Sequence, residues 1–164
     1  MGMVACFTAI APQELQRLRE DPGEIEEFLY PDGGNEEPPN YFDLDKAWHG
    51  LHYLLTVETY GGKPPLSQAV LGGVEFGEDG GYGPARYLEA SEVRDIAGAL
   101  ARVTPDALAQ RFDPADMESR QIYPDIWVSE GDEALEFLLD GFGGLKEFYV
   151  GAAARGDAVV QWIA

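Results

Sequence analysis

The segment DAVVQWIA (157–164) has the composition of a β-strand, because it combines β-branched residues with a tryptophan in one short run. A second apolar run, MVACFTAI (3–10), indicates another strand, and it ends before Pro12, where a proline suits the first turn of a helix. A third strand is expected in ARYLEA (85–90). Strands near both ends with helices mainly between them predict an α+β fold, a small mixed or antiparallel sheet packed against several helices. A doubly wound parallel sheet is less favoured, because strands and helices do not alternate regularly.

The segments between these strands predict helices and loops from their caps and breakers. Helices are expected at about 12–20, 21–30, 44–57, 91–103 and 132–155, the last one broken near Gly141, Gly143 and Gly144. Two shorter helices are expected after Thr104-Pro105 and Asp113-Pro114, because each pair joins a capping oxygen to a proline in the first turn. The remaining segments are loops at 31–40 and 60–65, a brief helical turn at 66–73, and an extended stretch at 121–129 interrupted by Pro124.

Length and charge limit the classes of function. The 164 residues are 45% hydrophobic and 12% aromatic, which predicts one domain covering 1–164. Thirty acidic residues against 11 basic ones give a net charge of −19, which would repel a phosphate backbone and argues against nucleic acid as a partner.

The same reading indicates where the protein resides. The sequence has no run of eighteen apolar residues, so no membrane span is expected. It also has no basic segment followed by a long apolar run near its start, so no secretion signal is expected. The single cysteine, Cys6, lies in an apolar run and is expected to be a buried small hydrophobe, consistent with a reducing cytoplasm.

The acidic residues are unevenly distributed along the chain. Residues 1–45 carry eleven acids against Arg17 and Arg19, and residues 113–140 carry nine against Arg120 alone. One interpretation is an ordinary solvated surface. The other is a negative face that steers a basic protein partner towards it. The two interpretations are compatible.

Both histidines of the chain lie in DKAWHGLHYLLT (45–56). On a helix at about 100° per residue, His49 and His52 share one stripe with Asp45, at the edge of an apolar face that includes Trp48. We expect His49 to lie at the surface and His52 at the boundary of the core. Gly50 costs about 1 kcal/mol relative to alanine inside a helix, which suggests that another segment approaches the backbone there.

These residues offer a limited chemistry. A pair of histidines three residues apart lacks the spacing and the further ligands of a zinc site, so no metal or other cofactor is expected. A single imidazole beside a carboxylate can still transfer a proton near neutral pH, which makes His52 with Asp45 a candidate binding or acid–base pair. Its candidate neighbours are Trp48, Tyr82, Arg86, Tyr87, Tyr123 and Asp125. Taken singly, each of them is better explained by packing, by a surface ion pair or by the needs of a turn.

Other catalytic patterns do not fit the sequence. No serine lies in a G-x-S-x-G elbow, and the glycine-rich GEDGGYG (77–83) lacks the Lys-Ser/Thr of a phosphate-binding loop. Glu78 and Asp79 in that loop would repel phosphate. The spacing of oxygen ligands in an EF-hand is also missing.

Several motifs together resemble the bacterial YfbM-like family, the domain of unknown function 1877. They are MGM (1–3), LDKAWHGLHYLLT (44–56), PLSQAVLGG (65–73), GYGPARYL (81–88), IYPDIW (122–127) and GDAVVQWI (156–163). The resemblance spans nearly the whole chain in the same order, and it implies a single cytoplasmic α+β domain with no established biochemical activity. Asp45, Trp48 and His52 match the pattern of the family, whereas the position of His49 is not generally a histidine.

Two hypotheses of function follow from different classes. The first is a non-enzymatic interaction protein, such as an acidic immunity-type protein that covers the basic active site of a toxin. The alternative is an enzyme or small-ligand-binding protein that uses His52 with Asp45, Arg86 or Tyr123. The aromatic content is compatible with a homodimer in either case.

Overall fold

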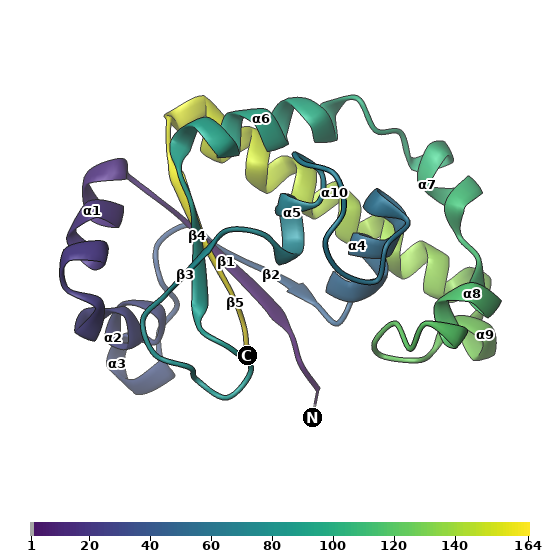
Figure 1. The fold of residues 1–164 in the computed structure, drawn as a ribbon, viewed down its shortest axis with the longest axis horizontal. Helices are drawn as coiled ribbons and strands as arrows, with labels where there is room; N and C mark the ends of the chain where they lie inside the picture. Colours follow the sequence, from purple (N-terminus) through teal and green to yellow (C-terminus); the bar gives the residue numbers. More distant parts are fainter. Residues whose placement is uncertain (1) are drawn as a thin grey trace.

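A five-stranded antiparallel sheet organises the chain, of which the computed structural model describes residues 2–164 (Figure 1). Its strands are β1 (Ala5–Ile10), β2 (Tyr41–Asp45), β3 (Val74–Phe76), β4 (Ala85–Leu88) and β5 (Ala158–Ile163). Their order across the sheet is β2-β1-β5-β4-β3, and every neighbouring pair is antiparallel. The predicted α+β class is confirmed, and the sheet is antiparallel rather than mixed.

The central strand β5 and its neighbour β1 are buried along almost their whole length. Alternate residues of a strand point to opposite faces, so a strand covered on both sides needs apolar residues at consecutive positions. Phe7 and Val159 accordingly belong to the larger core on one face, whereas Cys6, Val160 and Trp162 belong to a smaller core on the other. This is why both runs are apolar without alternation in the sequence.

Helices cover both faces of the sheet (Figure 1). The smaller core lies under α1 (Pro12–Glu20), the 3₁₀ turn η1 (Pro22–Glu24) and α2 (Ile25–Leu29), which are followed by the short α3 (Pro31–Gly34). The larger core lies under α4 (Trp48–Thr56), α6 (Ala90–Ala101) and α10 (Asp132–Arg155). Four short helices complete the chain: α5 (Gln68–Leu71), α7 (Pro105–Arg111), α8 (Pro114–Ser119) and α9 (Trp127–Glu130). No helix among residues 2–164 is long and apolar enough to cross a membrane.

The two predicted helix starts at Thr104-Pro105 and Asp113-Pro114 are confirmed. Thr104 Oγ1 accepts a hydrogen bond from the N–H of Ala107 at 3.1 Å, and the carboxylate of Asp113 accepts one from the N–H of Asp116 at 3.1 Å. Both helices have proline in the first turn, as predicted. Helix α6 begins at Ala90 rather than at Ser91, because Glu89 caps it in a reciprocal capping box with Glu92.

The prediction for residues 43–47 is wrong. Instead of opening α4, Tyr41–Asp45 forms the edge strand β2 against β1, and α4 begins only at Trp48. Asp45 ends the strand in the left-handed region, with φ +53°. The pairing partner of this short, mixed segment lies more than thirty residues away, so local propensity gives little indication of the strand. The edge strand β3 was not predicted either, because it is only three residues long and pairs along one side alone, with β4.

Three further differences concern the second half of the chain and the loop at 31–40. Helix α10 runs unbroken through its glycines, because these allow close packing: a Cβ on Gly141 would lie 3.2 Å from the side chains of Leu44 and Ala47, and one on Gly144 would lie 2.9 Å from the ring of Phe42. The segment 121–129 is not extended but turns into α9, and the 31–40 loop contains α3.

Gly50 has the packing role that its position in a helix suggests. A Cβ there would lie 2.5 Å from Cη2 of Trp127 and 2.8 Å from Cδ2 of Leu138, and both side chains are fully buried. The close approach of α4 to these side chains therefore requires glycine.

We predict that Gly50→Ala lowers the free energy of unfolding by about 1–3 kcal/mol, since the overpacking outweighs the gain in helix propensity. Gly98 in α6 is the matched control: it is exposed and a Cβ there meets nothing within 4 Å. Gly98→Ala should stabilise the protein by about 0.5–1 kcal/mol. Urea denaturation of both variants checks the pair, and equal effects at the two glycines would contradict the packing explanation.

Candidate functional site

His49 is a buried structural histidine and not the surface residue that was expected. Only 1% of it is exposed. Its Nδ1 accepts a hydrogen bond from the backbone N–H of Tyr123 at 2.9 Å, and its Nε2 lies 3.0 Å from the carbonyl oxygen of Thr59. Because a carbonyl oxygen can only accept, the proton must be on Nε2, which assigns a neutral tautomer. The ring thus joins α4 to two loops, and burial lowers its pKa.

His52 lies fully inside the molecule rather than at the boundary of the core. Neither ring nitrogen has a hydrogen-bond partner, although the backbone at Gly61 is nearby. Burial lowers the pKa of His52 from 6.5 to about 4, and the positive charge of Arg86 adds a small effect in the same direction. The imidazole is therefore neutral at physiological pH. None of its surface is exposed, and it lines neither of the two cavities described among residues 2–164.

Asp45, Trp48 and Tyr123 do not form a site with His52. Asp45 lies on β2, exposed, so it does not share the helical stripe of the two histidines. The Trp48 indole N–H donates to the carbonyl of Met3 at 3.0 Å, and the Tyr123 hydroxyl accepts from the N–H of Met3 at 2.9 Å. The two rings stack with centroids 5.5 Å apart. Trp48 and Tyr123 therefore hold the segment that leads into β1.

Arg86 also has a structural role that its position in the sequence did not indicate. Its guanidinium is largely buried and donates to the carbonyl oxygens of Gly72, at 2.9 Å, and Val70, at 3.5 Å, where α5 ends. Gln161 on the neighbouring strand donates to the same Gly72 oxygen at 2.6 Å. Cations are favourable at the C-terminal end of a helix, so Arg86 anchors α5 to the sheet.

The last three candidates lie apart from one another. Tyr87 is buried in β4 and packs under the guanidinium of Arg19, 4.8 Å from its ring centroid. Asp125 is exposed in the turn before α9. Tyr82 is exposed and, alone among the candidates, lines a cavity.

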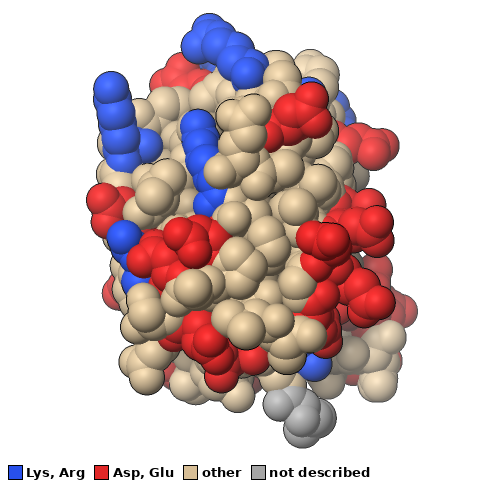
Figure 2. All heavy atoms as spheres, turned by 90° about the vertical axis from the view of Figure 1, so that its right-hand side faces the viewer, with Lys and Arg blue, Asp and Glu red and all other residues tan. Residues whose placement is uncertain are grey.

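Acidic side chains cover the end of the molecule formed by α8, α9 and the start of α10. Of the nine acids in residues 113–140, all but Asp116 are exposed. Asp116 pairs with Arg120 at 2.9 Å, so the one basic residue of this segment is already neutralised. Figure 2 shows this end, with Asp and Glu spread over its middle and lower parts. This end is an acidic surface.

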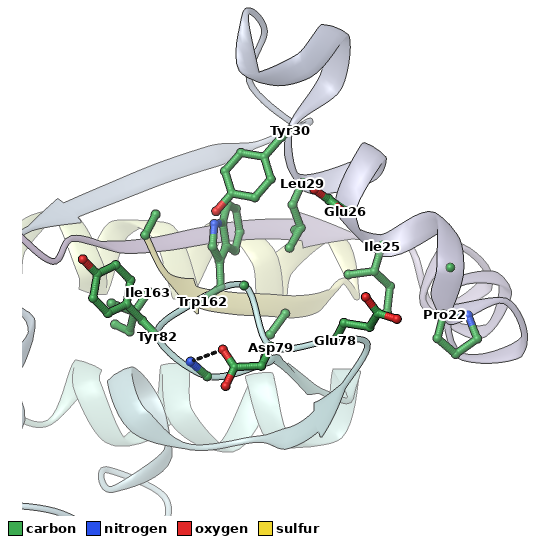
Figure 3. A pocket seen from close by; sticks show the side chains of 15 residues that line it. Pro22, Ile25, Glu26, Leu29, Tyr30, Glu78, Asp79, Tyr82, Trp162 and Ile163 are labelled. Atoms are coloured by element: carbon green, nitrogen blue, oxygen red, sulfur yellow. Dashed lines mark hydrogen bonds between the residues drawn. The ribbon is translucent and has the colours of Figure 1, made fainter.

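A more specific site is a cavity of about 510 Å³ between the α2 region, the 77–83 loop and the end of β5 (Figure 3). Its lining residues are Pro22, Gly23, Ile25, Glu26, Leu29, Tyr30, Glu78, Asp79, Gly80, Tyr82, Gly83, Ala85, Trp162, Ile163 and Ala164. They include three carboxylates and three aromatic rings, and no Lys, Arg or His. We call it the acidic-aromatic cavity.

The loop that forms one wall of this cavity is organised by Asp79. Oδ1 of Asp79 accepts hydrogen bonds from the N–H groups of Gly81, at 2.7 Å, and Gly83, at 3.0 Å. Gly81 and Gly83 have φ of +120° and +92°, a region that favours glycine. The turn presents Tyr82 and Glu78 on the side of the cavity opposite Tyr30 (Figure 3).

Trp162 contributes the polar group that is least satisfied. Its side chain is only 4% exposed. Its indole N–H makes no hydrogen bond of normal geometry among residues 2–164, although it interacts with the hydroxyl of Tyr30. It lies beside Tyr30, whose ring meets it edge-on with centroids 6.3 Å apart (Figure 3). Burial raises the pKa of the Tyr30 hydroxyl, opposed in part by the nearby indole N–H. An unpaired buried donor costs about 1–3 kcal/mol, so a bound acceptor atom would stabilise this wall.

Sequence reasoning missed most of this cavity. Glu26, Glu78 and Trp162 come from three segments that are distant in sequence, and only the fold brings them together. The glycine-rich loop contained one indication of the site in the sequence. The charges of Glu78 and Asp79, which would repel phosphate, would also attract a cation.

Comparison with known proteins places the whole chain in one group. A family model described as "Domain of unknown function (DUF1877)" matches residues 1–162. Among solved structures, a protein of unknown function, YfbM from Escherichia coli, is similar with a TM-score of 0.77 and 21% sequence identity, covering 98% of this chain and 99% of that one. At this identity the structural likeness shows the fold. No curated protein matches the chain.

We predict that the Nε2–H tautomer of His49 persists at pH 6, because the folded structure uses Nδ1 as an acceptor and burial lowers the pKa. Long-range ¹H–¹⁵N correlation spectra of the imidazole rings measure this directly. A protonated Nδ1 at neutral pH would show that the hydrogen bond from Tyr123 is absent.

We predict that His52 makes the fold less stable in mild acid. Its pKa is about 4 when folded and 6.5 when exposed, so the unfolded chain binds the proton first and stability is lost as the pH falls from about 6.5 towards 4. At pH 5 the loss is roughly 2 kcal/mol. His52→Leu removes this contribution while leaving all carboxylates in place.

Urea denaturation of both proteins at pH 7 and pH 5 measures the difference. The decrease in unfolding free energy between the two pH values should be smaller in the variant by roughly 2 kcal/mol. An equally steep decrease in both proteins would mean that other groups cause it.

Proposed function

We propose that this chain, which belongs to the family of the domain of unknown function DUF1877, is a non-enzymatic binding protein whose partner is a basic protein. The observation that carries the proposal is the acidic-aromatic cavity, a concave site with three carboxylates and no basic side chain in its lining. Partners of opposite charge gain association rate and specificity from such complementarity.

The surface around the cavity supports the same partner. Exposed acids on and after the neighbouring helices extend the negative charge beyond the cavity; they include Asp21, Glu27, Glu36 and Glu37. The two arginines of this region are engaged internally, since Arg17 pairs with Glu14 and Glu24 and Arg19 pairs with Glu89. Little positive charge is left on this side to oppose a basic protein.

The proposed setting is the cytoplasm, where a single buried thiol such as Cys6 remains reduced. Burial raises the pKa of Cys6 to about 11, which keeps the thiol protonated and unreactive. An acidic protein that covers the basic active site of another protein, as an immunity protein covers a toxin, is one form that this partnership would take.

A second candidate function is the binding of a small molecule in the same cavity. Its volume of about 510 Å³ lies within the usual range of ligand sites, roughly 300–1,000 Å³. The hypothesis that His52 contributes to a ligand-binding site has no support from the geometry, because His52 lines neither described cavity. The cavity itself keeps this alternative open.

We predict that neutralising acids around the cavity releases a basic partner captured from an extract of the source organism at low salt. The cavity-side variant carries Asp21→Asn, Glu27→Gln, Glu36→Gln and Glu37→Gln, none of which lines the cavity. At about 0.5 kcal/mol for each exposed charge pair, the loss in affinity is roughly 30-fold. Affinity capture with mass spectrometry, followed by titration of the purified partner, measures it.

The matched control changes the net charge by the same amount at the opposite end. It carries Glu130→Gln, Glu133→Gln, Glu136→Gln and Asp140→Asn, four exposed acids of the α9–α10 surface. This variant should retain the partner. Equal loss in both variants would indicate unspecific attraction to net charge, and recovery of no basic protein by the wild type would refute the proposal.

A further inference from the structure

We propose that the acidic-aromatic cavity binds the guanidinium of an arginine side chain that projects from the partner, with the indole N–H of Trp162 donating to a carbonyl oxygen of the same peptide. This inference rests on the proposed function and specifies its recognition chemistry. The carboxylates, the aromatic rings and the buried indole N–H of the cavity support it.

The carboxylates indicate a cation that is larger than a metal ion. Glu26 comes from α2, whereas Glu78 and Asp79 come from the facing loop. None of the three forms an ion pair within residues 2–164, and no group of three carboxylates in that range is close enough to hold a metal ion. Acids on two opposite walls suit a cation with donors on several sides, which a guanidinium provides with its five N–H groups.

The rings and the apolar residues fit the rest of an arginine. Tyr30, Tyr82 and Trp162 surround the opening from three elements (Figure 3), and a planar guanidinium stacks on aromatic faces better than a compact ammonium does. Tyr30 and Tyr82 are 39% and 57% exposed, so their rings are available to a ligand. Ile25 and Leu29 offer apolar surface to the methylene groups of the side chain.

The buried indole donor distinguishes a peptide from a simple cation. The Trp162 N–H is buried and makes no hydrogen bond of normal geometry, although it interacts with the Tyr30 hydroxyl. The carboxylates of the cavity would satisfy a cation alone but leave this donor without a full acceptor. A peptide carries carbonyl oxygens close to each side chain, so one arginine residue supplies both the cation and the acceptor. The other two indole N–H groups are already used, Trp48 by the Met3 carbonyl and Trp127 by the Ile122 carbonyl at 2.8 Å.

The three tryptophans provide the experiment with internal references. The intact ¹⁵N-labelled protein is titrated with the peptide acetyl-Gly-Arg-Gly-amide, and the three indole N–H signals are followed by NMR. We expect a saturable downfield shift of the Trp162 signal, with the signals of Trp48 and Trp127 unchanged. The same peptide with citrulline in place of arginine, which is neutral and of nearly the same shape, should bind at least about tenfold more weakly.

Variants test the two halves of the site separately. The double variant Glu26→Gln with Glu78→Gln removes a charge from each wall and should lower the affinity for the arginine peptide by roughly tenfold or more. Glu130→Gln with Glu136→Gln is the control of equal charge and should leave binding unchanged. Trp162→Phe removes the donor while keeping a ring, and it should reduce the preference for the peptide over agmatine, a guanidinium compound without a carbonyl group.

Each outcome separates this inference from the proposed function. If the arginine peptide does not shift the Trp162 signal but the wild-type protein still captures a basic protein through the acids around the cavity, the inference is wrong and the proposed function stands. If agmatine binds as tightly as the peptide, the site accepts a free organic cation and the assignment to a polypeptide is overturned. If the peptide binds as predicted but no basic protein is captured, the cavity chemistry stands and the proposed function fails.

Discussion

Pairing of β1 with β5 brings residues 5–10 against residues 158–163 along the full length of both strands. Strand β5 is the central strand of the sheet and β1 lies next to it, and each is buried on both faces. One face needs α4, α6 and α10 to cover it, and the other needs α1 and α2. The positions of the helices, and with them the acidic-aromatic cavity at the end of β5, therefore depend on this contact between segments that are far apart in the chain.

The parts of the fold that were predictable are those that local chemistry specifies. The caps at Thr104 and Asp113 fix their helices with hydrogen bonds that span three residues, and the apolar runs of β1 and β5 are buried whatever their neighbours. The edge strand Tyr41–Asp45 was not predictable in this way, because its conformation depends on β1. The glycines of α10 were misleading for a related reason: they interrupt a helix by propensity, yet here Gly141 and Gly144 allow Leu44 and Phe42 to approach.

The candidate site was harder to predict from the sequence than the fold. Residues that attract attention in the sequence, namely His49, Arg86, Trp48 and Tyr123, are used to fasten loops and the segment before β1. Such polar residues are distinctive because buried hydrogen bonds need exact partners, which explains how structural residues can look catalytic. The cavity, by contrast, uses ordinary acids and tyrosines whose significance appears only when Glu26, Glu78 and Trp162 are seen together (Figure 3).

The central position of β5 also has a consequence for the order of events during synthesis. Residues 158–163 are synthesised after the other four strands of this sheet, and until they emerge from the ribosome β1 and β4 lack the strand that lies between them. The nascent chain must therefore keep two apolar strand edges apart from each other and from other chains, a state in which aggregation competes with folding. The high negative charge, carried early by residues 11 to 45, would help to keep that intermediate in solution. This acidic part of the chain is thus made well before the strand that completes the sheet.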